Sequence, residues 1–254
     1  MKIEGIGETI ANNILDISTR KNIEKNIRLM KKNNVDIIPI NVKSYPQNLK
    51  EIYDPPVSLY IKGNKDILNN KSIAIIGCRE ASEYGIKAAK YFSYNLSKEG
   101  MNIVSGLAKG VDSYAHIGSI CAQNEERSQN EKIEIGKTIA VVGSGLDIIY
   151  PKENKYLYNE IIKAGGAIIS EYPIGTKPNK MNFPARNRIV SGISSGVLVI
   201  EAKEKSGTLI TVDFALEQGR DVYVVPGNIN SINSVGTNDL IKQGAKLVTN
   251  YKEI

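Results

Sequence analysis

The stretch SIAIIG at residues 72–77 is followed by YGIKAAKYFSYNLSKEG at 84–100 and then by a second apolar run, NIVSG at 102–106. The two apolar runs have the length of strands, and the segment between them has helical spacing. Apolar runs without polar alternation are typical of strands that are buried on both faces of a parallel sheet. This stretch therefore predicts a strand–helix–strand unit with parallel strands.

The same rhythm continues toward the C-terminus. Further runs of strand length are TIAVVG (138–143), AIIS (167–170), GVLVIE (196–201), DVYVV (221–225) and AKLV (245–248), and a segment of helical spacing, TLITVDFALEQG, occupies 208–219. Alternating strands and helices favour an α/β fold in which a doubly wound, mostly parallel sheet carries helices on both faces. Right-handed crossovers then bring the carboxyl ends of the strands, and the binding crevice, to one edge.

The region before the first of these strands has a different pattern. IGETIANNILDI (6–17) and NIEKNIRLMKKN (22–33) have helical spacing, and DIIPI (36–40) reads as a short strand. We therefore expect a small, mainly helical N-terminal region with a lead-in over residues 1–65 and a core over residues 66–254. The polar stretch NEERSQNEKIEIG (124–136) is predicted to be an exposed insertion in that core.

Composition excludes several classes of protein. Of 254 residues, 41% are hydrophobic and 24% are charged, which is typical of a globular chain and not of a disordered one. No apolar run approaches the roughly 20 residues of a membrane span, and the N-terminus lacks an apolar signal core. We therefore expect a cytoplasmic protein. Two cysteines and one histidine are too few for a disulfide framework or a multi-histidine metal site. The net charge of +6 weakly favours a polyanionic partner.

Glycine turns follow several of the predicted strands. Gly77, Gly106 and Gly143 end three of them, and Ser206-Gly207-Thr208 begins the helix after a fourth. Glycine lets a ligand approach the backbone closely, and free N–H groups at a helix start attract phosphate. The first turn lacks the GxGxxG pattern of dinucleotide-binding proteins, and no P-loop is present. These turns therefore predict a phosphate-binding edge without NAD binding or ATP hydrolysis.

Basic and aromatic side chains accompany these turns. Arg79 follows the first turn, Lys109 lies in the second, and Lys152 lies beyond the third; Lys180 precedes the segment FPARNR at 183–188. Cations for phosphates and flat rings for unstacked bases are what a groove for single-stranded nucleic acid needs. In the alternative interpretation, the cations are merely solvated loop residues and Phe183 only anchors its loop to the core.

At these motifs the chain resembles the DprA/Smf family of DNA-processing proteins. The resemblance runs from Tyr45 to Val248 through the segments IIGCREASEYG, SGLAKGVDSYAH, AVVGSGLDIIYPKEN, SEYPIGTKP, FPARNRIVSG and EAKEKSGTLITVDFALEQGRDVYVVPG. It implies a Rossmann-like core that binds single-stranded DNA, protects it and delivers it to the recombinase RecA in competition with single-strand binding protein. It also implies a homodimer that acts in recombination and natural transformation.

The resemblance also implies which residues bind DNA. The family's DNA-contacting arginine and lysines fall on Arg79, Lys152 and Lys180, and the glycine turns form the floor of the pocket. The complete set of predicted DNA-binding residues is Gly77, Arg79, Ser82, Gly106, Lys109, Gly143, Lys152, Lys180, Phe183, Arg186 and Asn187. No catalytic residue, cofactor or metal ion is expected.

Three features depart from the family pattern. The first motif has Cys78 where the family usually has serine, so backbone donation survives but a hydroxyl contact does not. Because the sequence ends at Ile254, we expect no C-terminal winged-helix domain of the kind that many relatives carry. Third, Gly5-Ile6-Gly7 with Ala11 and Ile14 resembles the turn and second helix of a helix-hairpin-helix, but we expect its first helix to be missing, because too few residues precede the turn. The turn could offer backbone N–H groups to a duplex phosphate, and a small helical cap that only packs on the sheet is the alternative.

Two functions are alternatives to the binding of single-stranded DNA. LOG-like nucleotide phosphoribohydrolases carry a PGGxGTxxE motif with a catalytic glutamate, but here the matching stretch, KEKSGTLIT at 203–211, has Thr211 at that position. A nucleotide-sensing module would use the same phosphate-binding edge for a mononucleotide. Asp112 and His116 lie four residues apart on a predicted helix, and we expect Asp112 to hold a structural histidine there.

Overall fold

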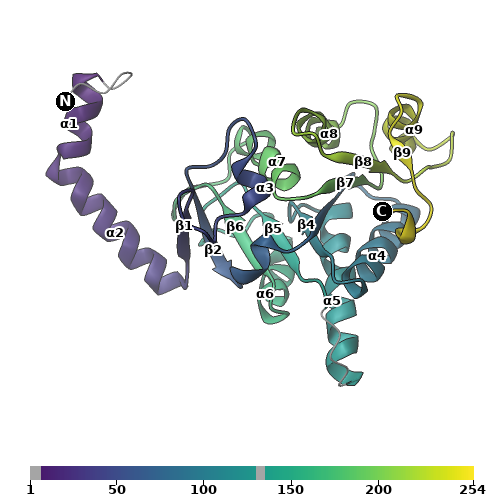
Figure 1. The fold of residues 1–254 in the computed structure, drawn as a ribbon, viewed down its shortest axis with the longest axis horizontal. Coiled ribbons are helices and arrows are strands. Elements are labelled where there is room, and N and C mark those ends of the chain that lie inside the picture. Colours follow the sequence, from purple (N-terminus) through teal and green to yellow (C-terminus); the bar gives the residue numbers. More distant parts are fainter. Residues whose placement is uncertain (1–6, 130–134) are drawn as a thin grey trace.

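A computed structural model describes residues 7–129 and 135–254 and shows one mixed sheet with helices on both faces (Figure 1). Within these residues the sheet has nine strands in the order β1-β2-β6-β5-β4-β3-β7-β8-β9. The strands are β1 (Asp36–Pro39), β2 (Ser58–Gly63), β3 (Ser72–Ile76), β4 (Asn102–Ser105), β5 (Thr138–Val141), β6 (Ala167–Ser170), β7 (Gly196–Val199), β8 (Asp221–Val224) and β9 (Lys246–Leu247). The longer helices are α1 (Glu8–Leu15), α2 (Ile17–Asn33), α4 (Glu83–Lys98), α5 (Val111–Gln129), α6 (Lys155–Lys163), α7 (Asn182–Gly192), α8 (Gly207–Glu217) and α9 (Val235–Lys242).

In the described part of the chain the sheet is parallel from β6 to β9, and the pairs β1–β2 and β2–β6 are antiparallel. The chain adds β4, β5 and β6 on one side of β3, and then crosses to the other side for β7, β8 and β9. The predicted doubly wound α/β fold is therefore confirmed. In such a sheet, ligands bind outside the carboxyl ends of the strands at the point where the strand order reverses. Here that point lies between β3 and β7.

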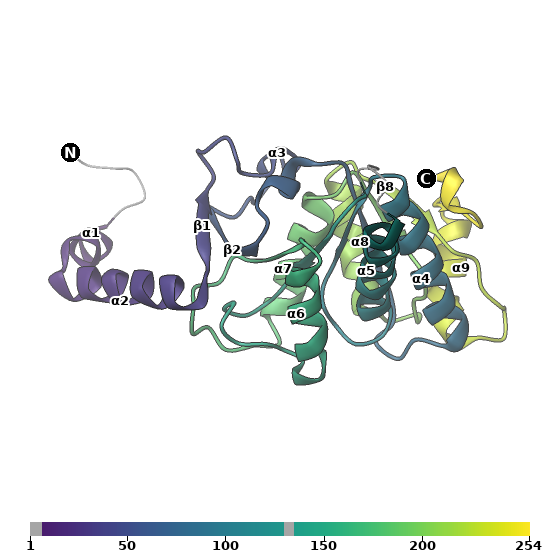
Figure 2. The ribbon, with the colours of Figure 1, turned by 90° about the horizontal axis from the view of Figure 1, so that it is seen from below.

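The side chains of each strand alternate between two buried layers. In β3, Ile73 and Ile75 pack with α4 residues such as Phe92, whereas Ala74 and Ile76 face the layer that contains Ile189 of α7. Figure 2 shows α4, α5 and α6 as one group of helices along the sheet. Because both faces are covered, the apolar runs need no polar alternation.

Of the N-terminal elements, β1 and β2 belong to the sheet, whereas α1 and α2 form an arm outside it. Strand β2 pairs with β6, with Ile61 opposite Ile169. Helices α1 and α2 extend away from the body (Figures 1 and 2). The division at residue 65 stays a prediction, although strands on its N-terminal side pair with the sheet of its C-terminal side. Gly5 and Ile6 of the proposed helix-hairpin-helix turn lie outside the described residues.

The polar stretch 124–136 agrees only in part with the expected exposed insertion: Asn124 and Glu125 are exposed, but the end of the stretch is not. Helix α5 continues to Gln129, and Glu, Arg and Gln in this part are good helix formers. Residues 130–134 lie outside the described part. At the other end, Ile135 is buried and Gly136 N donates to Ser97 O at 2.9 Å. The first part of this polar stretch therefore continues helix α5, and its last residues pack against the body of the protein.

The helices α4 and α5 are the longest that cover the sheet. In the described part of the chain, neither these nor any other helix combines the length and apolar character needed to cross a membrane.

Candidate nucleic-acid interface

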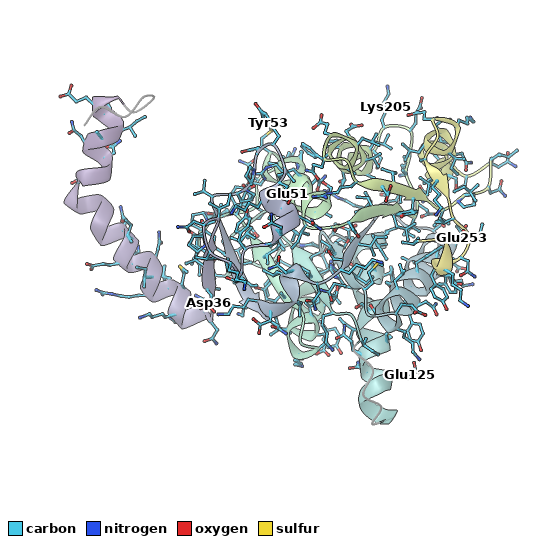
Figure 3. The ribbon with its side chains drawn as sticks, in the orientation of Figure 1. Asp36, Glu51, Tyr53, Glu125, Lys205 and Glu253 are labelled. Atoms are coloured by element: carbon cyan, nitrogen blue, oxygen red, sulfur yellow. The ribbon has the colours of Figure 1, made fainter. Side chains whose placement is uncertain are left out.

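A cavity of about 670 Å³ opens at the carboxyl edge of the sheet, where the strand order reverses between β3 and β7. Three chain segments build most of its wall: the turn after β3, the start of α7 with the residues before it, and the turn between β7 and α8. Ala108, Asp112 and Tyr150 complete it. The residues that line it include Gly77, Cys78, Arg79, Glu80, Lys180, Phe183, Arg186, Asn187, Lys203, Lys205, Ser206 and Thr208. Lys205 stands at the outer surface beside α8 (Figure 3).

An aromatic pair with a cation beside it forms one side of this cavity. The rings of Tyr150 and Phe183 stack with their centroids 5.4 Å apart and an interplanar angle of 30°. The guanidinium carbon of Arg79 lies 5.9 Å from the centre of the Phe183 ring. A cation over a ring is attracted to the electrons of the ring face. The arrangement offers a flat apolar surface and a positive charge at neighbouring points.

Arg186 lies beneath the cavity rather than at its mouth. It is 5% exposed, and its Nη1 donates to Val141 O at 3.0 Å. Burial lowers the pKa of the Arg186 guanidinium, while the negative charge of Asp112 opposes that effect. Burial also raises the pKa of Asp112, against the effect of Arg186. Arg186 and Asp112 thus lie together at the floor of the cavity.

The glycines Gly106 and Gly143 make room for these side chains. A Cβ on Gly106 would lie 1.8 Å from Arg186 Nη1, and Gly106 N donates to Asp112 Oδ2 at 3.2 Å. A Cβ on Gly143 would lie 3.2 Å from the Phe183 ring. The N–H group of Gly106 is thus engaged by protein, and we infer that these two glycines matter for packing. Gly77 does line the cavity.

Ser82 points into the protein and caps α4. Its Oγ donates to Glu201 Oε1 at 2.5 Å and accepts from Gly85 N at 3.1 Å, and its backbone N–H donates to Glu201 Oε2 at 3.0 Å. Glu201 is 1% exposed. Asn233 Nδ2 donates to the backbone oxygen of Glu80 at 2.9 Å. Glu201 and Asn233, which sequence reasoning missed, therefore fix the turn that carries Arg79.

The predicted lysines fall into two groups. Lys180 lines the cavity, whereas Lys109 and Lys152 lie outside its lining. Lys109 Nζ pairs with Glu153 Oε1 at 2.5 Å on the surface. Sequence reasoning missed Lys203 and Lys205, which line the cavity; Lys203 Nζ lies 2.8 Å from Glu80 Oε2. The structure thus gathers six of the eleven predicted residues around the cavity, namely Gly77, Arg79, Lys180, Phe183, Arg186 and Asn187.

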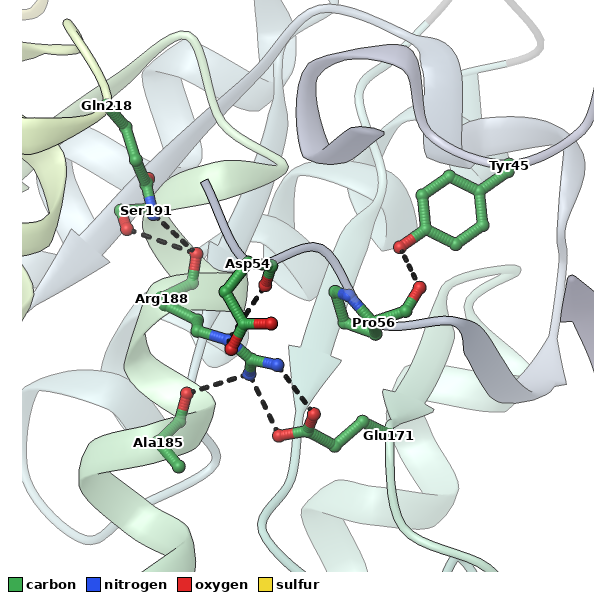
Figure 4. A network of polar contacts seen from close by, with 8 residues as sticks. All are labelled: Tyr45, Asp54, Pro56, Glu171, Ala185, Arg188, Ser191 and Gln218. Atoms are coloured by element: carbon green, nitrogen blue, oxygen red, sulfur yellow. Dashed lines mark hydrogen bonds and ion pairs between the residues drawn. The ribbon is translucent and has the colours of Figure 1, made fainter. Parts of the chain in front are cut away.

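An ion-pair network holds α7, the helix that supplies Phe183 (Figure 4). Arg188 donates from Nη1 and Nη2 to the two oxygens of Glu171 at 2.9 and 2.7 Å. Its Nε donates to Asp54 O at 3.0 Å and lies 3.3 Å from Asp54 Oδ2. Burial alone would lower the pKa of Arg188, but the bonds and charge of Glu171 raise it overall. The network ties α7 to the end of β6 and to the loop before β2.

His116 has a different partner from the one expected. Its Nδ1 lies 2.6 Å from Thr138 Oγ1, and because that hydroxyl donates to Ile103 O at 3.1 Å, the imidazole is the donor to it. The ring is 0% exposed. Asp112 instead accepts from the backbone N–H groups of Gly106 and Ala108. The expected Asp112–His116 pairing is therefore replaced by a contact between α5 and the start of β5.

Acid should destabilise the fold through His116. Burial lowers its pKa from 6.5 to about 3, so below pH 6.5 the unfolded chain takes up a proton that the folded chain refuses. The free energy of unfolding should fall by about 1.4 kcal/mol per pH unit as the pH drops from 6.5 toward 4. Urea unfolding of the wild type and His116→Leu at several pH values tests this. The variant should lack that part of the slope, and parallel slopes would contradict the assignment.

The residues that the structure describes contain no cluster of three or more His, Cys, Asp or Glu side chains suited to a metal ion. Cys78 lies in the cavity wall, and burial raises the pKa of its thiol. The raised pKa keeps Cys78 in the thiol form, which is a poor nucleophile.

Comparison with known proteins agrees with this fold. The sequence profile of the DNA recombination-mediator protein A family matches residues 36–254. DNA processing protein DprA of Streptococcus pneumoniae is 46% identical over 210 residues, which cover 83% of this chain and 70% of that protein. Protein Smf of Escherichia coli is 40% identical over 235 residues, which cover 92% of this chain and 60% of that protein.

Two solved structures share the fold. The crystal structure of the Streptococcus pneumoniae DprA superposes with a TM-score of 0.78 at 44% identity, covering 86% of this chain and 72% of that one. A DprA from Helicobacter pylori, described for its mode of binding single-stranded DNA, gives a TM-score of 0.72 at 30% identity and covers 86% and 93% of the two chains. The chain therefore belongs to the DNA recombination-mediator protein A family, that of the DNA-processing proteins DprA and Smf.

Proposed function

We propose that the chain binds single-stranded DNA at the cavity between β3 and β7. The observation that carries this proposal is the stacked Tyr150–Phe183 pair with Arg79 beside it, in a cavity that Lys180, Lys203 and Lys205 also line. Rings accept unstacked bases of any sequence, and cations neutralise phosphates. Duplex DNA keeps its bases stacked and cannot use the rings. The single-strand binding of the Helicobacter pylori relative supports the same conclusion.

Anisotropy of a labelled thymidine oligomer tests the proposal in a salt series, with a duplex of the same length as the control. We expect the single strand to bind more tightly than the duplex. If about four phosphates are neutralised, log affinity should fall with log salt at a slope of about −3. Little dependence on base sequence is expected, because phosphates and stacking carry no code. Equal binding of both forms, or of neither, would contradict the proposal.

We further propose that the chain transfers bound single-stranded DNA to RecA. The chain would protect the strand and load RecA on it in competition with single-strand binding protein, as a cytoplasmic homodimer that acts in recombination and natural transformation. Two linked grooves would raise avidity without new contacts. The family membership supports this role. The test is RecA filament formation on strands coated with single-strand binding protein, which the chain should accelerate, together with sedimentation of the free chain.

We propose binding without catalysis. Thr211 replaces the carboxylate that a phosphoribohydrolase would need to stabilise its positively charged transition state, and it is 3% exposed. His116 is fully buried and paired with Thr138. Release of base or ribose phosphate from nucleoside monophosphates by the purified chain would overturn this. A nucleotide-sensing module would bind a mononucleotide as tightly as an oligomer, which competition in the same anisotropy assay resolves.

Glu80 should limit the affinity of the site. Its carboxylate lines the cavity and pairs with Lys203, which holds the pKa of Glu80 below its usual value. The substitution Glu80→Gln frees Lys203 to contact a phosphate. It also removes a negative charge that repels the phosphates. We expect single-strand affinity to rise a few-fold and the salt slope to steepen by up to about 0.7. Glu153→Gln, which frees Lys109 outside the cavity, is the matched control and should have the smaller effect.

A further inference from the structure

We propose that the outer face of α4 is a second contact surface for single-stranded DNA, on which the strand continues after it leaves the cavity between β3 and β7. This inference rests on the proposed function. The α4 face consists of Tyr84, Lys87 and Tyr91 together with Pro226, Thr249 and Tyr251, which lie against them.

A second hollow, of about 260 Å³, marks this face. It is lined by Tyr84, Lys87, Ala88, Tyr91, Phe92, Val225, Pro226 and Thr249. Val225 and Pro226 directly follow β8, and Thr249 follows β9. The hollow therefore lies at the same carboxyl edge of the sheet as the first cavity, displaced toward β9.

The tyrosines of the α4 face are exposed and held in place. Tyr84 is 49% exposed and Tyr91 is 40% exposed. Seven residues apart, they lie on one side of the helix at a spacing of about 10 Å, with Lys87 between them. Tyr84 Oη donates to Pro226 O at 2.7 Å, and the Tyr91 ring meets the Tyr251 ring edge-on at 6.1 Å. Rings that are fixed before binding lose little conformational entropy when a base stacks on them.

Lys87 supplies a positive charge to the α4 face, one turn after the exposed Glu83 at the start of the helix. Lys252 Nζ lies 5.9 Å from the Tyr251 ring centre, whereas Lys90 lies off this face, with its Nζ 5.2 Å from the ring centre of Tyr114 in α5. The carboxylate of the neighbouring Glu253 is already engaged, since it accepts from the backbone N–H groups of Thr249 and Asn250. A lysine between two exposed tyrosines suits a polyanion with stackable bases, whereas an acidic peptide would leave the rings unused.

Continuity with the first cavity identifies the strand as the occupant. Tyr84 lies two residues after Ser82, which Glu201 holds to the end of β7. Arg79 lies three residues before Ser82 in the same turn. One fixed segment of backbone therefore carries the cation of the first cavity and the first ring of the α4 face. A strand that leaves Arg79 in this direction meets Tyr84 next.

Two thymidine oligomers separate the surfaces: one of about 6 nucleotides, sufficient for the first cavity, and one of about 25. The double variant Lys87→Ala/Tyr91→Leu should lose about tenfold in affinity for the long oligomer and nothing for the short one. Its salt slope on the long oligomer should be shallower by about 0.7. The control Lys50→Ala/Tyr53→Leu changes the same residue types on the surface near α3, far from Glu253 and the α4 face (Figure 3), and should lose nothing.

A fluorescence signal reports stacking directly. The chain contains no tryptophan, so Tyr91→Trp places a single indole on the α4 face and Tyr53→Trp places one on the control surface. The long oligomer should quench the first indole and leave the second unchanged, and the short oligomer should quench neither. This measurement stands even where the double variant folds poorly.

The outcomes distinguish the two proposals. If the wild type binds neither oligomer, the proposed function fails, and this inference fails with it. If the wild type binds both but the double variant and the Tyr91→Trp signal show no difference between oligomers, only the α4 face is refuted. The α4 face is also refuted as a DNA contact if the double variant binds both oligomers as the wild type does but sediments in a lower association state. In that case a second copy of the chain occupies this face in the wild type.

Discussion

The double variant Arg79→Ala/Lys180→Ala should lose about 100-fold or more in affinity for single-stranded DNA. Both side chains line the cavity between β3 and β7, and each can make a charge-assisted contact with a phosphate. Such contacts contribute about 1.5–3 kcal/mol each, and about 1.4 kcal/mol is a factor of ten. The salt slope should become shallower by about 1.4, since two counterions fewer are released. Anisotropy in a salt series measures both quantities.

A control must separate this site from the general attraction of a basic protein. Lys65→Ala/Lys71→Ala removes the same charge from the opposite edge of the sheet, because Lys71 directly precedes β3. Both of these lysines are exposed. If the two double variants weaken binding equally, only net charge matters and the cavity is not the site. Arg79→Lys adds a finer test, since it keeps the charge but loses the planar guanidinium beside Phe183, and an intermediate loss is expected.

The sequence predicts the fold well because the signal is local. Each buried strand is a run of about five apolar residues, and each helix repeats its apolar positions within its own length. Parallel order and right-handed crossovers then bring the strand ends together without further information. The position of the cavity follows in the same way, because Gly77, Arg79, Lys180 and Phe183 lie in the connections at that edge.

The orientation of individual side chains was not predictable, because it depends on contacts between distant residues. Ser82 meets Glu201 across 119 positions of sequence, and that carboxylate turns the hydroxyl inward to cap α4. Arg186 reads as a DNA contact in the segment FPARNR, yet its place in α7 puts it under the cavity. Lys203 and Lys205 were missed although they directly precede the turn Ser206-Gly207-Thr208, because that turn lies at the start of α8 and not at the end of β7. Local sequence patterns thus locate the edge of the sheet where the cavity lies. Packing between distant segments decides which side chains line it.

Arg188 pairs with Glu171 and Asp54, and we call these contacts the Arg188 clamp. Loss of the clamp should destabilise the fold more than any substitution at the mouth of the cavity. The Arg188 side chain is 12% exposed and that of its partner Glu171 is 18% exposed. Arg188→Met removes two charge-assisted bonds and leaves Glu171 mostly buried without its counter-ion. Breaking a buried pair from one side costs about 3–5 kcal/mol. For a chain of this size the midpoint of thermal unfolding should fall by about 6–20 °C.

A double-mutant cycle with Glu171→Leu identifies the cause. If the uncompensated carboxylate dominates, Arg188→Met/Glu171→Leu should recover most of the stability, because an apolar pair of similar volume is often neutral in place of a buried ion pair. Arg28→Met is the matched control: its pair with Glu24 is 82% and 66% exposed, and its loss should cost no more than about 0.5 kcal/mol. Additive losses in the cycle would contradict the explanation.

The clamp also links stability to binding. Arg188 lies in α7 five residues after Phe183, so a loosened α7 displaces the ring that stacks on Tyr150. Arg188→Met should therefore weaken binding of single-stranded DNA at temperatures where the chain is still folded, with the salt slope unchanged, because no phosphate contact is removed. The double variant with Glu171→Leu should recover stability more fully than affinity, since an apolar pair lacks the two fixed bonds that orient α7. Equal recovery of both would show that the clamp stabilises the fold without positioning Phe183.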